Sequence, residues 1–248
     1  MCLIRDGDGS MIELEISETT PEISKLLLAR GTALPAVQWH HNRSSTAKKT
    51  LDAMDDAQLF APTSLKNESM SAAVRALLYL WNGWIDESTM YAQGARPKES
   101  LFILAISERH RGRADAAKAF FRQLDDHSIY PSLAQTATEL IGSSPDDALN
   151  RFREILNLNG AWEPYAFIDI YEQARVDETK ITVGEFVREM QRQEFALLLG
   201  HCFQAATGGE VTKQGKAKPR KVAPRRKQED LAEKRDRLIR QKSMRKST

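Results

Sequence analysis

The feature that most constrains the fold is the spacing of small and aromatic residues within the segment 77–124. Gly112, Ala117 and Phe121 follow one another there, with four residues in the first gap and three in the second. On a helix, Ala117 and Phe121 share one face, so a neighbouring helix can approach the small residue while the ring fills the adjoining space. The same step recurs at 148–152. We therefore expect a mainly α fold of stacked antiparallel helical hairpins, arranged as a solenoid or a bundle.

Apolar periodicity and glycine or proline breaks predict a series of short helices. An early helix begins after Thr20, and the main apolar stripe begins near Asn67. In the last helix of the body, Thr182 and Glu185 fit the spacing of a capping box. Between the main stripe and the end of the body, helices are expected at about 86–93, 98–111, 113–125, 131–141, 145–157, 163–175 and 183–206.

Three regions are predicted along the chain. Residues 1–66 form an N-terminal extension with one or two helices, and the alternating run at 11–16 predicts one short strand or an extended arm. Residues 67–208 form the helical-hairpin domain. Residues 209–248 form a basic tail, which we expect to be disordered at first, because it has few apolar groups, and then marginally helical.

Cysteine content and hydropathy indicate the compartment. Cys2 and Cys202 are the only cysteines, so no disulfide framework is expected and a reducing compartment fits. No run approaches the roughly 20 consecutive apolar residues of a membrane span, and the first residues lack a secretory signal. We expect a cytoplasmic protein with no membrane contact. In a cell with a nucleus, the basic run 219–227 could also act as a localisation signal.

Charge is divided unevenly along the chain. Residues 213–248 hold 15 lysines and arginines against four acids, a net charge of +11, while the preceding residues have a net charge of −9. Clustered cations can neutralise phosphates without reading sequence, so contact with nucleic acid or another acidic partner is predicted. Stacking of nucleic-acid bases on the tail is not predicted, because the tail has no aromatic residue. The predicted contact residues are Lys218, Arg220, Lys221, Arg225, Arg226 and Lys227. A solubilising tail and an intramolecular clamp on the acidic body are alternatives.

Several motifs between residues 70 and 206 occur in the order found in one known family. They are the runs at 80–81, 85–88, 92–93, 100–101, 117–121, 162–169 and 193–199, with Arg109 and Gly112 between them. In these runs the chain resembles an uncharacterised family of bacterial helical proteins with tetratricopeptide-like hairpins. That family has no assigned activity, so the resemblance implies a fold and no chemistry. Members often carry histidines just after the run 85–88 and in the next helix, whereas Thr89 follows here and His110 is that helix's only histidine.

Four residues are candidates for catalysis. Asp86 and Glu87 follow the Asn82–Gly83 break beside two tryptophans, where a partly desolvated carboxylate could act as a general acid or base. The structural alternative is that Asp86 or Ser88 caps the next helix. Glu108 and His110 end a later helix, where flanking arginines could hold an anion and the histidine could carry a proton, or the cations could simply complement the helix dipole.

No cofactor or metal site is predicted. His40 and His41 are adjacent and have no further ligand at a suitable spacing, while His127 and His201 stand alone in the sequence. Cys202 lies on an apolar helix face, as a buried inert thiol would. No phosphate loop, nucleophile elbow or zinc-protease motif occurs.

These observations predict a non-enzymatic interaction protein: a helical body that binds an unidentified protein partner, and a basic arm that contacts nucleic acid or another acidic partner. Two alternatives remain. One is an enzyme of unknown class with its site between helices, built from Asp86, Glu87, Glu108 and His110. The other is a purely structural protein that assembles with itself.

Overall fold

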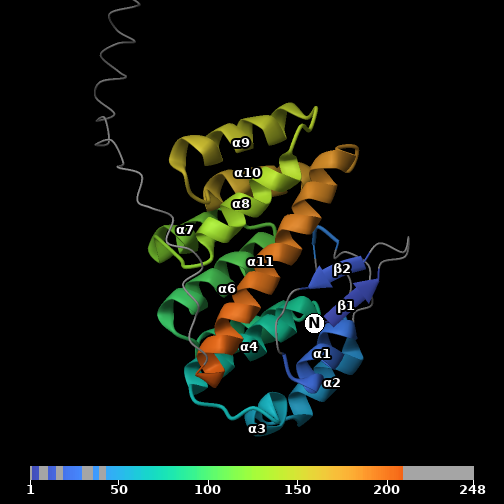
Figure 1. Ribbon diagram of the computed structural model, residues 1–248, viewed down its shortest axis with the longest axis vertical. Helices are drawn as coiled ribbons and strands as arrows, with labels where there is room; N and C mark the ends of the chain where they lie inside the picture. Colours follow the sequence, from blue (N-terminus) through green and yellow to red (C-terminus); the bar gives the residue numbers. More distant parts are fainter. Residues whose placement is uncertain (1, 6–10, 15–18, 30–35, 39–42, 209–248) are drawn as a thin grey trace, which may run out of the picture. The chain divides into compact units, whose positions relative to one another are not determined.

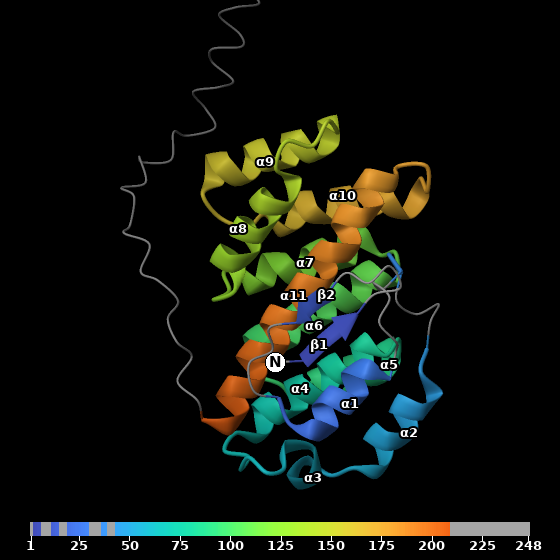
Figure 2. The same cartoon turned by 45° about the vertical axis from the view of Figure 1, so that its right-hand side comes forward.

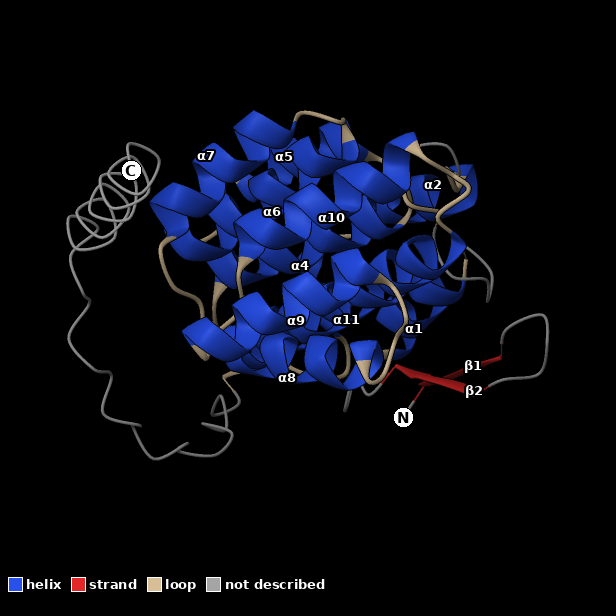
Figure 3. Cartoon of the chain, turned by 90° about the horizontal axis from the view of Figure 1, so that it is seen from above, coloured by secondary structure: helices blue, strands red, loops and turns tan. Residues whose placement is uncertain are grey.

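A computed structural model describes residues 2–5, 11–14, 19–29, 36–38 and 43–208. Within these ranges helices dominate, so the predicted mainly α fold is confirmed (Figure 3). The helices are α1 (Pro21–Leu28), α2 (Ser45–Ala53), α3 (Asp56–Phe60), α4 (Glu68–Trp81), α5 (Ile85–Ala92), α6 (Pro97–His110), α7 (Ala114–Leu124), α8 (Tyr130–Ile141), α9 (Asp147–Asn159), α10 (Pro164–Val176) and α11 (Ile181–Thr207).

A short antiparallel hairpin precedes the helices. It consists of β1 (Cys2–Arg5) and β2 (Met11–Leu14), with Cys2 opposite Leu14 and Arg5 opposite Met11. The strand expected within 11–16 is therefore present, and it has a partner that was not predicted from the sequence. The earlier strand is only four residues long, too short to show a clear alternating pattern.

Consecutive helices pack in pairs, as the spacing of the sequence predicted. The pairs α4–α5, α6–α7, α8–α9 and α10–α11 are each in contact. Glycines with a left-handed backbone make two of the turns, Gly83 with φ 82° after α4 and Gly112 with φ 72° after α6. Such a conformation lets the chain leave a helix abruptly at little steric cost.

The last helix connects the pairs. Besides α10, α11 contacts α4 and α8, and Figures 1 and 2 both show it running along the stacked helices. Near its end, the carbonyl of Ala206 accepts hydrogen bonds from the backbone amides of Lys66 (2.8 Å) and Asn67 (3.1 Å). In an open solenoid each unit contacts only its neighbours. The contact between α11 and the distant α4 therefore makes this fold closer to a closed bundle.

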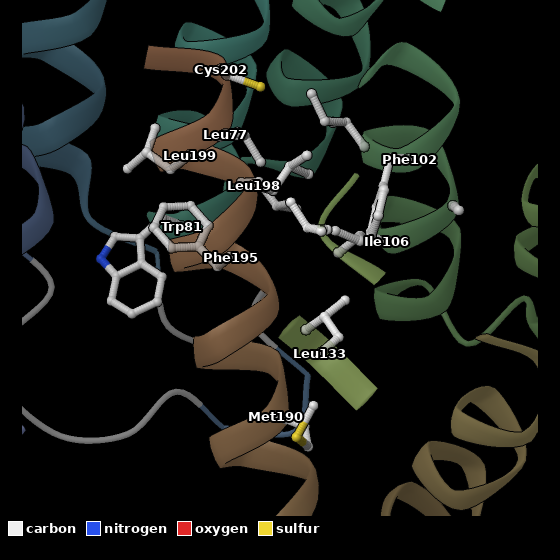
Figure 4. Close-up of a cluster of buried hydrophobic side chains, with 14 of the residues drawn as sticks. Leu77, Trp81, Phe102, Ile106, Leu133, Met190, Phe195, Leu198, Leu199 and Cys202 are labelled. Carbon is white, nitrogen blue, oxygen red and sulfur yellow. The ribbon is translucent and has the colours of Figure 1, made fainter. Parts of the chain in front are cut away.

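The main core lies where α11 meets α4, α6 and α8. Figure 4 shows side chains of all four helices converging there. Trp81 of α4 stacks on Phe195 of α11, with ring centroids 4.6 Å apart, and Leu133 of α8 and Ile106 of α6 are also buried. Burial of such side chains supplies most of the free energy that holds helices together.

The N-terminal segment shares this core, so the predicted boundary at residue 66 does not separate two compact units. The described part of this segment holds three helices, more than the one or two predicted. Thr20 caps α1 as predicted, and its hydroxyl also donates to the carbonyl of Leu59 at 2.7 Å. The indole N–H of Trp81 donates to the carbonyl of Leu27 at 3.0 Å, tying α1 to α4.

Two predicted helix caps are wrong. Helix α5 begins at Ile85, before Asp86, and Ser88 lies buried inside it, so neither side chain caps the helix. Helix α11 begins at Ile181 without a side-chain cap, so Thr182 lies within it and no capping box forms. Helix α5 begins at the buried Ile85, whereas α11 begins at the exposed Ile181, after the turn 177–180. Before α4, the side chain of Asn67 caps the helix by accepting a hydrogen bond from the backbone amide of Met70.

The basic tail, with its predicted disorder and C-terminal helix, lies outside the described residues. Of the helices in the described ranges, none is long and apolar enough to cross a membrane.

Substitution of two neighbouring phenylalanines of α7, which differ in burial, tests how α7 packs against α6. Phe121 is buried and meets Phe102 edge to face at 5.3 Å between ring centroids, whereas Phe120 is only partly buried. We predict that Phe121→Ala lowers the free energy of unfolding by about 3–5 kcal/mol, because it leaves a cavity between helices. The matched control, Phe120→Ala, should cost no more than about 2 kcal/mol. Urea unfolding measures both, and equal losses would contradict the packing.

Candidate functional site

Two of the predicted catalytic residues share one arginine. Arg111 pairs with the carboxylate of Asp86 at 2.6 Å and with that of Glu108 at 2.8 Å, and Arg113 reaches Glu108 at 3.2 Å. The Asp86 side chain is 84% exposed, so water as well as the guanidinium stabilises its charge. The desolvation proposed for this carboxylate is therefore not present.

The other two predicted residues lie elsewhere. Glu87 pairs with Lys48 of α2 at 3.1 Å. Hydrogen bonds to Asp52 and Glu87 raise the pKa of Lys48, so its ammonium group stays protonated at neutral pH. His110 is fully buried, and its ring lies edge-on to Tyr171 with centroids 6.0 Å apart. The structure thus brings together Asp86 and Glu108 of the four candidates, and a shared catalytic role for all four stays a prediction.

Arg109, one of the two arginines that flank His110 in the sequence, is already paired with an acidic side chain. Arg109 forms a two-pronged ion pair with Glu194 of α11, and both side chains are 1% exposed. Its guanidinium also lies over the rings of Phe167 at 4.9 Å and Tyr171 at 5.4 Å. A buried pair of this kind fixes how α6 lies against α11, because removing either partner would leave an uncompensated charge.

A different cluster, of two histidines and one glutamate, lies where three elements meet: α6, α11, and the turn that precedes α8. Nε2 of His201 lies 3.0 Å from Oε1 of Glu99, and the rings of His201 and His127 are 5.1 Å apart. Each of the three residues offers one potential ligand atom, and these atoms lie within 4.8 Å of one another. Among the described residues, these three form the group of histidine, cysteine or acidic side chains whose possible ligand atoms lie close enough together to share a metal ion.

Local contacts position each member. Glu99 lies in the first turn of α6, just after Pro97. The ring of His127 packs edge-on to Phe102 at 5.1 Å, and its Nδ1 accepts a long hydrogen bond of 3.4 Å from the backbone amide of Ile129. Nδ1 of His201 lies 3.3 Å from the hydroxyl of Ser128. The side chains are therefore held by packing and by second hydrogen bonds.

Burial sets the protonation of the cluster. Burial, with a smaller contribution from the nearby His201 and against the opposing effect of Glu99, lowers the pKa of His127 to about 4. Burial tends to raise the pKa of Glu99, but the hydrogen bond with His201 and a backbone hydrogen bond outweigh it, so the pKa lies below its ordinary value. At neutral pH, His127 is neutral and Glu99 is ionised.

No sequence signal could have found this cluster. Glu99 and His201 are 102 positions apart, and His127 lies in a turn between helices. His127 and His201 are isolated residues in the sequence, whereas folding places their rings in contact. The predicted tail residues, from Lys218 to Lys227, lie outside the described residues, as do His40 and His41.

Comparisons of the chain with protein families, with characterised proteins and with solved structures find no match. Function is therefore inferred from the residues and their geometry.

We predict that the metal-free protein loses stability as the pH falls from about 6.5 to 4. Over this range the unfolded chain protonates His127, while the folded chain keeps it neutral, since its folded pKa is about 4. Stability must fall as the pH falls, because a histidine whose pKa is lowered by folding stabilises the folded state above its unfolded pKa and loses that effect as acid is added. The loss should approach about 3 kcal/mol, measured by urea unfolding in the presence of a chelator.

Glu99 contributes little to this measurement above about pH 5.5, because carboxylates with an ordinary pKa near about 4.3 are almost fully ionised there. The matched control is His127→Asn, whose amide oxygen can still accept the Ile129 amide but does not titrate. In this variant the slope between pH 6.5 and 5.5 should flatten. An unchanged slope would show that His127 is not the group responsible.

Proposed function

We propose that this protein is a non-enzymatic interaction protein, whose helical body docks a protein partner and whose basic tail contacts nucleic acid or another acidic partner. The observation that carries the proposal is the charge division, +11 in residues 213–248 against −9 in the rest of the chain. Such a division favours a polyanionic partner for the tail, because the cations would release counterions from phosphates. We place this function in the cytoplasm, or in the nucleus of a cell that has one.

The pairing of the charged residues in the body supports a binding role. Asp86 and Glu108 are neutralised by Arg111, and Glu87 by Lys48. These ion pairs are partly exposed, as is usual on a solvated surface. Carboxylates paired with cations on a solvated surface are commoner than catalytic carboxylates, so this pairing favours a binding role.

Exposed apolar side chains support a protein partner for the body. On the α8–α9 hairpin, Leu140, Ile155 and Leu158 are exposed, Leu158 to 85%. Figures 1 and 2 both place α9 at one end of the stacked helices. Exposed apolar groups at the end of a helical stack are typical of surfaces that dock another protein or a second copy of the same chain.

The tail proposal predicts a strong salt dependence. Deleting residues 213–248 should leave the body folded, by circular dichroism, but abolish retention of RNA or duplex DNA at low salt. Replacing Lys218, Arg220, Lys221, Arg225, Arg226 and Lys227 with glutamine should make the plot of log affinity against log salt shallower by about 5, since each cation that pairs with a duplex phosphate contributes about 0.9.

A matched control keeps the charge and changes the order. A variant with residues 213–227 shuffled should bind as the natural chain does, because counterion release does not depend on sequence. Equal retention by the tail-less protein would contradict the proposed role of the tail. Light scattering on the same samples distinguishes a second copy from another partner, since self-assembly would raise the measured mass without nucleic acid.

A further inference from the structure

We propose that Glu99, His127 and His201 form a binding site for one divalent transition-metal ion of the Zn²⁺ class. None of these three residues belongs to the basic tail or to the exposed apolar residues of α8 and α9, so the site does not depend on the function proposed above. The three ligands come from three separate elements: the first turn of α6, the turn before α8, and α11.

The types of ligand select the class of ion. Two imidazole nitrogens and one carboxylate oxygen suit Zn²⁺ and its first-row neighbours, whereas Mg²⁺ and Ca²⁺ prefer sites made wholly of oxygen. Three protein ligands would leave a fourth position of a tetrahedral ion for water or another small ligand. Cys202, next to His201, is fully buried, and burial raises the pKa of its thiol well above the ordinary value, so we do not include it among the ligands.

The spacing of the ligand atoms fits an ion after a small adjustment. Ligands at 2.0–2.2 Å from a tetrahedral ion lie about 3.3 Å from one another. The atoms of Glu99 and His201 are 3.0 Å apart, close to this value. His127 completes a set that lies within 4.8 Å, so its ring has to move inward by no more than about 1.5 Å to share the ion with the other two.

One buried nitrogen atom of His127 is free to bind an ion. Nε2 of His127 is buried and has no hydrogen-bond partner among the described residues, although the side chain is only 2% exposed. A buried polar atom without a partner costs free energy, and a metal bond would remove that cost. Coordination through Nε2 puts the imidazole proton on Nδ1, so the metal bond replaces the long hydrogen bond from Ile129.

Charge and orientation agree with this assignment. The neutral state of His127 and the ionised state of Glu99 are the ones that metal ligands require. On His201, the hydroxyl of Ser128 contacts Nδ1 and leaves Nε2 directed at Glu99. A second contact of this kind orients a metal-bound histidine. The bound ion would join α6 to α11 through the turn between them.

The test uses the full chain, freed of metal by a chelator and then titrated with Zn²⁺ or Co²⁺. We expect one equivalent of ion to bind and the thermal midpoint to rise. Bound Co²⁺ should show the visible absorption of a tetrahedral site with nitrogen and oxygen ligands, without a thiolate charge-transfer band. The backbone amide resonance of Ile129 should shift as Nδ1 ceases to accept its proton.

Variants locate the ion. Glu99→Gln, His201→Gln and His127→Phe should each weaken Zn²⁺ binding by about 100-fold or more, since each removes one of three ligands. His127→Phe keeps an aromatic ring against Phe102, so it is the variant most able to fold. The matched control is Glu108→Gln on the same helix α6, which should bind the ion as the natural chain does.

Two results would overturn the proposal. The first is that the natural chain binds no Zn²⁺ or Co²⁺ at one equivalent, a measurement that requires no variant. The second is that folded His127→Phe binds the ion as tightly as the natural chain, which would place the ion elsewhere, for example at His40 and His41 or in the tail.

Discussion

The packing of α11 along the helical hairpins is the contact on which the rest of the structure depends. Its apolar face covers α4, α8 and α10, and Trp81 stacks on Phe195 at the centre of that contact. Hairpins that met only their neighbours would leave one face of each pair in water. Because α11 crosses the stack, residues far apart in the sequence become neighbours, and both buried polar clusters form along this helix.

Those clusters differ in what they can do. The pair of Arg109 and Glu194 joins two opposite charges through two hydrogen bonds, and aromatic faces flank the guanidinium. In the second cluster, Glu99, His127 and His201 meet, and the buried Nε2 of His127 has no hydrogen-bond partner among the described residues. The first cluster therefore accounts for the alignment of two helices, while the second gathers three side chains of the kinds that bind metal ions.

The sequence predicted the helices well, because their signals are local. The cap at Thr20 and the pairing of Ala117 with Phe121 depend on residues within one or two turns. It failed at two helix starts, where Ser88 lies buried inside α5 and Thr182 lies inside α11 in place of the predicted caps. The histidine cluster could not be predicted at all, because its members are brought together only when α11 folds back onto α6.

The most direct test of this packing is the reactivity of Cys202, which lies buried on the core face of α11 (Figure 4). In a Cys2→Ser background, its thiol can meet a water-soluble disulfide reagent only when α11 leaves the stack. We predict labelling at least about a thousandfold slower than in the denatured chain, since opening would cost much of the stability of the fold. Labelling at the rate of the denatured chain would contradict the packing of α11, and with it the closed bundle and the buried histidine cluster.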